Sequence, residues 1–207
     1  MKIEIINDFL NKKDFEDLHS LSLDVIGRNE LKVYHNSISG DNIKTECLSS
    51  ELLRRLQKNY HHTALELLKK LSPQKVSLYD YSEFHIIETG ADYEFPIHDD
   101  TPNKLLSGVV YIKPSINSGT TFYDSKNGDG KKEIEWKKNR AIFFSRVERE
   151  TWHSYKGDKK SNRIVLVYNL MTKRIREVFK IEKKNYLYGN FRYKFNPYIY
   201  RFFKKTI

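Results

Sequence analysis

Hydrophobic and polar residues alternate along most of the chain from residue 74 onward, with the period of two that is typical of half-buried β-strands. Short segments of this kind are separated by residues that favour turns, as in Thr89–Asp92 and Asn127–Gly130. Many short strands at near-regular spacing predict an antiparallel sandwich or barrel rather than a parallel α/β sheet. The candidate strands are Lys75–Tyr79, Glu83–Glu88, Glu94–His98, Leu105–Ile112, Thr120–Tyr123, Glu133–Lys137, Ala141–Ser145, Thr151–Tyr155 and Asn162–Asn169.

Before residue 74 the hydrophobic positions recur every three to four residues, which predicts helices. The longer helix should cover Ser49–Leu71 and end at Ser72-Pro73. A shorter one should begin at Asn11 or Asp14 and run to Leu23. We therefore expect a mostly helical part over residues 1–73, a strand core over 74–172, and a further short helix over Lys173–Ile181.

Length and composition narrow the class of protein. A chain of 207 residues suits one domain, and 39% hydrophobic residues are enough for a real core. No apolar run is long enough to span a membrane, and the acidic Glu4 near the start argues against a secretory signal. Cys47 is the one cysteine, which excludes an intrachain disulfide and favours a reducing compartment. We expect a cytoplasmic protein.

The net charge of +10 is concentrated at the C-terminal end. Residues 183–207 hold seven of the 37 Lys and Arg residues and none of the 27 Asp and Glu residues, so residues 1–182 carry +3. The basic residues of this extension are Lys183, Lys184, Arg192, Lys194, Arg201, Lys204 and Lys205. They are interleaved with nine aromatic residues: Tyr186, Tyr188, Phe191, Tyr193, Phe195, Tyr198, Tyr200, Phe202 and Phe203. Such a segment suits single-stranded nucleic acid or an anionic membrane surface, but we favour aromatic residues packed on the core with basic ones facing water.

Candidate chemistry centres on two histidines and one aspartate. His98 and Asp100 are two residues apart at the end of a predicted strand, so their side chains share one face. His153 lies on a later predicted strand. Two imidazoles and one carboxylate form the facial triad of non-haem Fe(II) oxygenases, which leaves coordination positions open. The alternative for His98 is a loop histidine paired with an acidic neighbour.

Arg163 strengthens the metal hypothesis. It opens the strongly apolar segment Ile164–Tyr168, which reads as a buried strand. A buried guanidinium needs an anionic partner, and its planar fork suits a carboxylate. The alternative is an arginine at the solvent-facing start of the strand, paired with Asp158.

Together, His98-x-Asp100, His153 and Arg163 resemble the signature of the Fe(II)- and 2-oxoglutarate-dependent dioxygenases, in particular the prolyl-4-hydroxylase-like branch. Four further segments resemble that family over roughly residues 3–172: Ile5–Leu10, Leu105–Pro114, Ser118–Asp124 and Ala141–Ser145. Two positions depart from it. Glu88 stands where many relatives carry a tyrosine, for which Tyr93 is a candidate substitute, and Ser118 replaces a usual glycine.

The resemblance implies a double-stranded β-helix (jelly roll), mainly β with N-terminal helices, over a catalytic domain of residues 1–182. It implies Fe(II) held by His98, Asp100 and His153, and 2-oxoglutarate held by Arg163 with Tyr111 as a hydrogen-bond partner. Dioxygen would be the second cosubstrate, with ascorbate as a candidate accessory. The implied reaction is C–H hydroxylation of a peptidyl or small-molecule substrate, with prolyl hydroxylation as the default.

Other readings stay open. Nucleic-acid demethylases of this fold usually carry a second arginine at the position of Asn169, which argues against that activity. A non-catalytic protein, or one that uses the basic extension to bind nucleic acid or a ribosome, is the alternative. Trp152, Tyr93 and His85 are candidates for the substrate pocket, although Trp152 and His85 also suit core packing. The charged segment 146–150 could bind substrate, but we expect a solvated loop. The sequence carries no signal for the oligomeric state.

Overall fold

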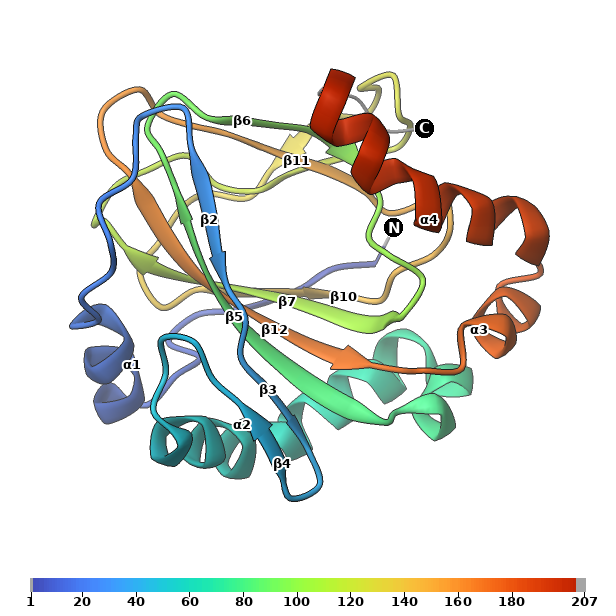
Figure 1. The fold of residues 1–207 in the computed structure, drawn as a ribbon, viewed down its shortest axis with the longest axis horizontal. Coiled ribbons are helices and arrows are strands. Elements are labelled where there is room, and N and C mark those ends of the chain that lie inside the picture. The colour runs from blue at the N-terminus through green and yellow to red at the C-terminus, as the bar shows by residue number, and fades with distance from the viewer. Residues whose placement is uncertain (1, 204–207) are drawn as a thin grey trace.

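The chain folds into two antiparallel sheets that face each other, with helices on the outer side of the larger one (Figure 1). The computed structural model describes residues 2–203, and side chains for residues 2–196. The larger sheet has the order β1 (Glu4–Ile6), β10 (Ala141–Phe144), β7 (Lys104–Lys113), β12 (Arg163–Met171), β5 (Tyr81–Thr89), β3 (Ser37–Ser39) and β4 (Asn42–Lys44), and β2 (Leu31–Tyr34) also pairs with β5. The smaller sheet has the order β6 (Glu94–His98), β11 (Trp152–Lys156), β8 (Thr121–Tyr123) and β9 (Lys132–Glu133). This architecture is a jelly roll, as expected.

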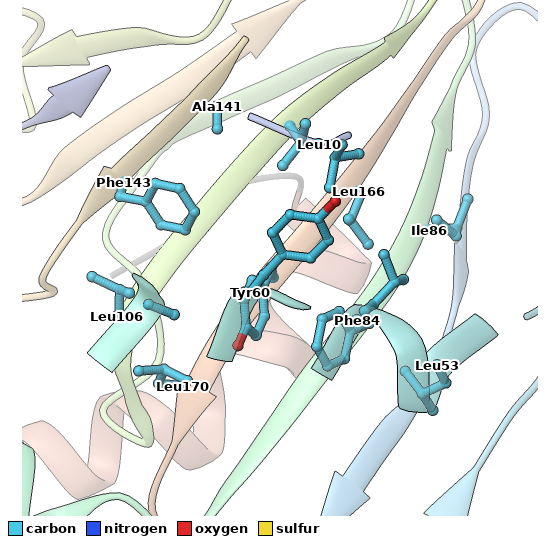
Figure 2. Packing of buried hydrophobic residues seen from close by; sticks show 14 of the residues in the cluster. Leu10, Leu53, Tyr60, Phe84, Ile86, Leu106, Ala141, Phe143, Leu166 and Leu170 are labelled. Carbon is cyan, nitrogen blue, oxygen red and sulfur yellow. The ribbon is translucent and has the colours of Figure 1, made fainter. Parts of the chain in front are cut away.

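The outer face of the larger sheet is covered by α1 (Lys12–His19) and α2 (Ser50–Leu71), which lie side by side beneath it in Figure 1. The predicted helix is present, and Ser49, expected as its first residue, instead caps it, because its side chain accepts a hydrogen bond from the Leu52 amide. The apolar stripe of α2 packs on the alternate residues of β5 and β12 that face it, such as Phe84 and Leu166. Figure 2 shows this packing. The helices thus cover one face of the sheet, and the candidate site lies on the other face.

A second, smaller cluster fills the space between the two sheets. It contains Val165 and Val167 of β12, and Phe144 of β10. Because side chains alternate along a strand, the odd-numbered residues of β12 point inward and the even-numbered ones toward α2. The sandwich interior is therefore only partly filled by apolar side chains, and the rest is a pocket.

Four expectations about secondary structure are wrong. The predicted strand Glu133–Lys137 is reduced to β9 (Lys132–Glu133), which pairs with β8. The part before residue 74 is not mostly helical, because residues 31–44 form β2, β3 and β4, which pair with β5 and with each other. The first helix ends at His19, where Lys113 of β7 donates to the carbonyl oxygens of His19 and Leu21. The segment Pro73–Leu78 is a 3₁₀ helix, not a strand, and buries Lys75 and Leu78 three residues apart.

The C-terminal segment forms two helices, α3 (Ile175–Ile181) and α4 (Tyr186–Phe203). In Figure 1, α4 crosses the end of the sandwich next to β6 and β11. No helix in the described part of the chain is long and apolar enough to cross a membrane. The expectations for Tyr198, Tyr200, Arg201, Phe202, Phe203, Lys204 and Lys205 lie outside the described side chains.

Candidate metal centre and active site

The structure brings His98, Asp100 and His153 together. One ligand atom from each lies within 4.8 Å of the others. The smaller sheet causes this meeting, because His98 of β6 and His153 of β11 are directly opposite each other in the antiparallel register. Asp100 follows β6 by two residues and is buried, so a carboxylate joins the two imidazoles from the adjoining loop.

Both imidazoles are oriented by backbone groups in the same way. Nδ1 of His98 lies 2.9 Å from the Pro96 carbonyl oxygen, and Nδ1 of His153 lies 3.0 Å from the Thr151 carbonyl oxygen. A carbonyl oxygen only accepts, so each Nδ1 carries a proton, and Nε2 is the nitrogen left to face a metal. Burial and the neighbouring His153 lower the pKa of His98 to about 3, so His98 is neutral at physiological pH. Neutral imidazoles with fixed tautomers are the form that binds a metal.

Asp100 is held in its ionised form by two donors. Its Oδ1 accepts from Lys104 Nζ at 2.6 Å and its Oδ2 accepts from Ser107 Oγ at 2.6 Å. Burial alone would raise the pKa of Asp100, but Lys104 outweighs it, with help from the two imidazoles, and lowers the pKa below its usual range. Each carboxylate oxygen uses one lone pair for its hydrogen bond, so its second lone pair remains free to bind a cation. The donor set of two Nε2 atoms and one carboxylate therefore fits Fe(II).

A pocket of about 190 Å³ extends from these three residues between the sheets. Arg163, which is 5% exposed and opens β12, lines the same pocket. Its guanidinium lies on Tyr155, two residues along β11 from His153, which sets it roughly 7 Å along the strand from that metal ligand. The remaining walls of the pocket come from both sheets: Leu31, Ile87, Thr89, Phe95, Lys104, Ser107, Val109, Thr120, Phe144, Ser154, Tyr155, Val165 and Val167.

Arg163 is buried without a carboxylate partner among the described residues. It makes a long contact from Nη1 to the Ser118 carbonyl oxygen at 3.4 Å, and its Nε has no hydrogen-bond partner. Its guanidinium stacks 3.4 Å from the centre of the Tyr155 ring. Thr120 Oγ1, on the same pocket, is also buried without a partner. These two unsatisfied groups fit the carboxylate end of a molecule such as 2-oxoglutarate.

The other predicted site residues lie elsewhere. The Tyr111 hydroxyl is buried and accepts from the Thr120 amide at 2.7 Å, with its ring stacked on Trp136, so it lies behind the pocket wall. Trp152 is the neighbour of His153 on the opposite face of β11 and donates Nε1–H to the Arg149 carbonyl oxygen. Tyr93 stacks near Phe95 and does not line the pocket.

His85 lies on the inward side of β5, with Nε2 3.0 Å from a carboxylate oxygen of Glu83 and its ring against His35. It does not line the pocket either. Glu88 faces away from the pocket, because its neighbours Ile87 and Thr89 line it. The tyrosine that stacks on Arg163 is therefore Tyr155, not the candidate Tyr93.

Several pocket residues were missed in the sequence. Tyr155 could have been found, since it is two residues after His153 and so on the same face of β11. Lys104 and Ser107 had no local signal, because their contact with Asp100 depends on how the loop after β6 returns to β7. The segment 146–150, expected to be solvated, instead buries Arg146 and Glu148 in an ion pair.

The fold and this geometry can be compared with known proteins. No protein-family model and no curated protein matches the sequence. Solved structures do match. A prolyl-4-hydroxylase from Pseudomonas putida has 13% identity over 83% of this chain and 92% of that chain, with a TM-score of 0.56. A 2OG-Fe(II) oxygenase family oxidoreductase from Burkholderia pseudomallei has 13% identity over 83% of this chain and 88% of that chain, with a TM-score of 0.58.

A third match is a prolyl hydroxylase in complex with a hypoxia inducible factor oxygen degradation domain peptide fragment from Trichoplax adhaerens. It has 15% identity over 85% of this chain and 86% of that chain, with a TM-score of 0.57. The chain thus has the jelly-roll fold of the 2-oxoglutarate- and Fe(II)-dependent oxygenases. Two of these three structures are prolyl hydroxylases, so the fold is similar to theirs, in line with the resemblance seen in the sequence.

Proposed function

We propose that the chain is an Fe(II)- and 2-oxoglutarate-dependent dioxygenase that hydroxylates an unactivated C–H bond. The observation that carries this proposal is one pocket with two complementary ends. At one end two imidazole Nε2 atoms and an ionised carboxylate converge, and at the other a buried guanidinium has no carboxylate partner among the described residues. A zinc or manganese site of the same ligand types would have no need of Arg163.

Each residue has a role in this proposal. His98, Asp100 and His153 would hold the metal, and the carbonyl groups of Pro96 and Thr151 would keep both imidazoles aimed at it. Bound Fe(II) would supply the reduction of dioxygen coupled to oxidative decarboxylation of 2-oxoglutarate, which gives succinate, carbon dioxide and a hydroxylated substrate. The chain itself contributes position and a site shielded from water.

Arg163 and Thr120 would bind the carboxylate of 2-oxoglutarate that is remote from the metal. A guanidinium presents two parallel N–H groups to a carboxylate, and Thr120 Oγ1 adds a hydroxyl donor. The Tyr155 ring, stacked on the guanidinium, fixes its orientation and covers one of its faces. Binding of the anion would remove the cost of an uncompensated buried charge.

We infer a peptidyl or small-molecule substrate. The Trichoplax structure is described as a hydroxylase with a bound peptide fragment, and prolyl hydroxylases are among the fold neighbours. Prolyl hydroxylation is accordingly the first reaction to assay, with ascorbate in the buffer.

The experiment compares two variants that act on opposite ends of the pocket. His153→Ala should abolish both binding of Fe(II) under anaerobic conditions and production of succinate. Arg163→Gln should leave Fe(II) binding unchanged but raise the KM for 2-oxoglutarate by at least ~30-fold, because loss of one partner of a buried charge pair costs about 2–5 kcal/mol. Isothermal titration measures the first effect, and succinate release measures the second.

If His153→Ala still released succinate at the wild-type rate in an iron-dependent manner, the assignment of the triad would be wrong. If Arg163→Gln kept the wild-type KM, the cosubstrate would bind elsewhere.

A further inference from the structure

The C-terminal helix α4 is fixed to the sandwich by one buried arginine. Arg192 is 3% exposed although it belongs to the basic extension. Its guanidinium lies 2.9 Å from an oxygen of Asp99 and also forms an ion pair with Glu148. All three side chains are nearly inaccessible to solvent. Removing one partner from such a cluster is strongly unfavourable, so α4 has a defined place.

This arginine connects α4 to the loop that carries a candidate metal ligand. Asp99 precedes Asp100 and also accepts from the Arg149 amide at 2.8 Å. Arg146, which pairs with Glu148, donates from Nε to the carbonyl oxygen of Asp100 at 3.1 Å. Two buried arginines thus fix this loop, Arg192 through the Asp99 carboxylate and Arg146 through the Asp100 carbonyl oxygen.

A glycine allows α4 to lie close to α3. A Cβ atom at Gly189 would lie 2.1 Å from Cε1 of Phe179, a ring that is itself fully buried. Gly189, Arg192, Tyr193 and Asn196 are three, four and seven residues apart and therefore share one face of the helix. That face points toward the metal ligands.

A second pocket, of about 200 Å³, lies between this face of α4 and the candidate metal centre. His98 and Asp100 line it, as they line the first pocket. Its other walls include Phe95 and Pro102 on one side and Tyr193 on the other.

The charges in this second pocket compensate one another. Arg146 and Arg192 pair with Asp99 and Glu148. Among the described residues, the one other acidic residue that lines this pocket is the candidate ligand Asp100, which pairs with Lys104. The rest of the wall includes the phenyl, pyrrolidine and phenol rings named above. A charged group placed here would lose its hydration and find partners that are already paired, which is costly.

We propose that the second pocket is a substrate subsite for an uncharged, apolar group, with α4 as its wall and Tyr193 as a specificity-determining residue. The inference rests on the proposed function, because it takes His98 and Asp100 as metal ligands. It makes α4 part of the active site rather than an appendage for nucleic acid.

The test uses the full-length protein and two probes of similar size: N-acetyl-leucinamide and the positively charged N-acetyl-lysinamide. Saturation-transfer NMR on the metal-free protein measures binding. Proton relaxation in the presence of Mn(II), with Zn(II) as the diamagnetic reference, then reports proximity to the metal. We expect the leucine probe to bind best, with its methyl protons relaxed by Mn(II).

Variants locate the effect. Tyr193→Ala should weaken binding of the leucine probe roughly tenfold, and Tyr193→Phe should retain binding because the ring is kept. Phe195→Ala is the matched control, since Phe195 is on the same helix but 47% exposed. If Tyr193→Ala does not fold, Pro102→Ala replaces it. This variant changes the other side of the pocket and should also weaken binding of the leucine probe roughly tenfold.

Equal or stronger binding of a charged probe would overturn the proposal, as would no binding of the leucine probe or no effect of the wall variants. Failure of the proposed function has a different signature. Mn(II) would then not bind to the wild-type protein, while the metal-free saturation-transfer result would still report on the pocket.

Discussion

Lys104 places a positive charge directly on the candidate ligand Asp100, at 2.6 Å, four residues further along the chain. Ser107 contacts the other oxygen of the same carboxylate at the same distance. The two donors orient the carboxylate alike but differ in their effect on a cation. Lys104 repels a divalent metal, whereas the neutral hydroxyl does not.

Lys104→Met should therefore tighten binding of Mn(II) or Fe(II) at least about tenfold, because charge repulsion outweighs the lost orientation. Ser107→Ala should weaken binding about tenfold, as is usual when a group that orients a ligand is removed. Calorimetric titration of the two variants measures both effects. Equal weakening in the two would mean that Lys104 acts by orientation alone.

At the scale of single elements, α1 and α2 are joined through one buried carboxylate. Asp14, in the first turn of α1, is fully buried and accepts from Tyr60, Asn59 and Arg55 of α2. Burial alone would raise the pKa of Asp14, but these hydrogen bonds outweigh it and lower the pKa below the usual 3.8. The ionised carboxylate thus stabilises the folded state.

Asp14→Asn should lower the free energy of unfolding by about 2 kcal/mol at pH 7, since hydrogen bonds to a charged group are lost. Because the folded pKa is the lower one, this contribution is fully present above pH 3.8 and is lost as the pH falls through the folded pKa. The difference between wild type and variant should be the same at pH 7 and pH 5 and shrink below pH 3.8. Urea unfolding at several pH values measures it.

Asp17→Asn is the matched control, because Asp17 pairs with the same Arg55 but is 42% exposed. We expect a loss of less than ~1 kcal/mol. An equal loss in both variants would contradict the role given to burial.

Elements with a strong local period could be predicted, and those defined by distant partners could not. The leucine spacing of α2 and the stop at Ser72-Pro73 predicted that helix to within a residue. The hairpin of β3 and β4 was missed even though Gly40, at φ 55°, begins a two-residue turn of the kind that joins strands. The strand β2 had no signal of its own, because it exists through pairing with β5.

The same distinction holds at the site. His98 and Asp100 were singled out by their spacing, since strand alternation fixes which side chains share a face. His153 and Arg163 joined them through the resemblance to the dioxygenase signature. The burial of Arg146, Glu148 and Arg192 could not be predicted, because it depends on where α3 and α4 pack after the sandwich is complete. Charge in the sequence suggested a solvated loop and tail. Mutual neutralisation in the fold buries Arg146, Glu148 and Arg192. The expectation that the aromatic residues of the tail pack on the core is wrong for Tyr188, Phe191 and Phe195, which stay about half exposed.

At the scale of the whole molecule, the candidate ligands join the two sheets. His98 and His153 belong to the smaller sheet, and Asp100 is bonded to Ser107 of the larger one. A metal bound to all three would therefore link the layers of the sandwich. Binding to the folded state alone should stabilise the entire fold.

Addition of Mn(II) at a hundred times its Kd should stabilise the protein by about 2.7 kcal/mol, or a rise in Tm of roughly 5–10 °C for a chain of this size. A chelator should reverse the rise, and His153→Ala should not show it. Differential scanning calorimetry measures the shift. A similar rise in His153→Ala would place the metal at another site.

The paired imidazoles have a consequence for how such a site changes over evolutionary time. Each is aimed by a main-chain carbonyl two residues earlier, at Pro96 and Thr151. Every residue type supplies that carbonyl, so no point substitution at either position deletes the acceptor itself. Strand pairing then places the two rings opposite each other. The orientation of both histidines thus depends on the backbone and on strand pairing. The neighbouring side chains can therefore change during evolution while the centre keeps its geometry.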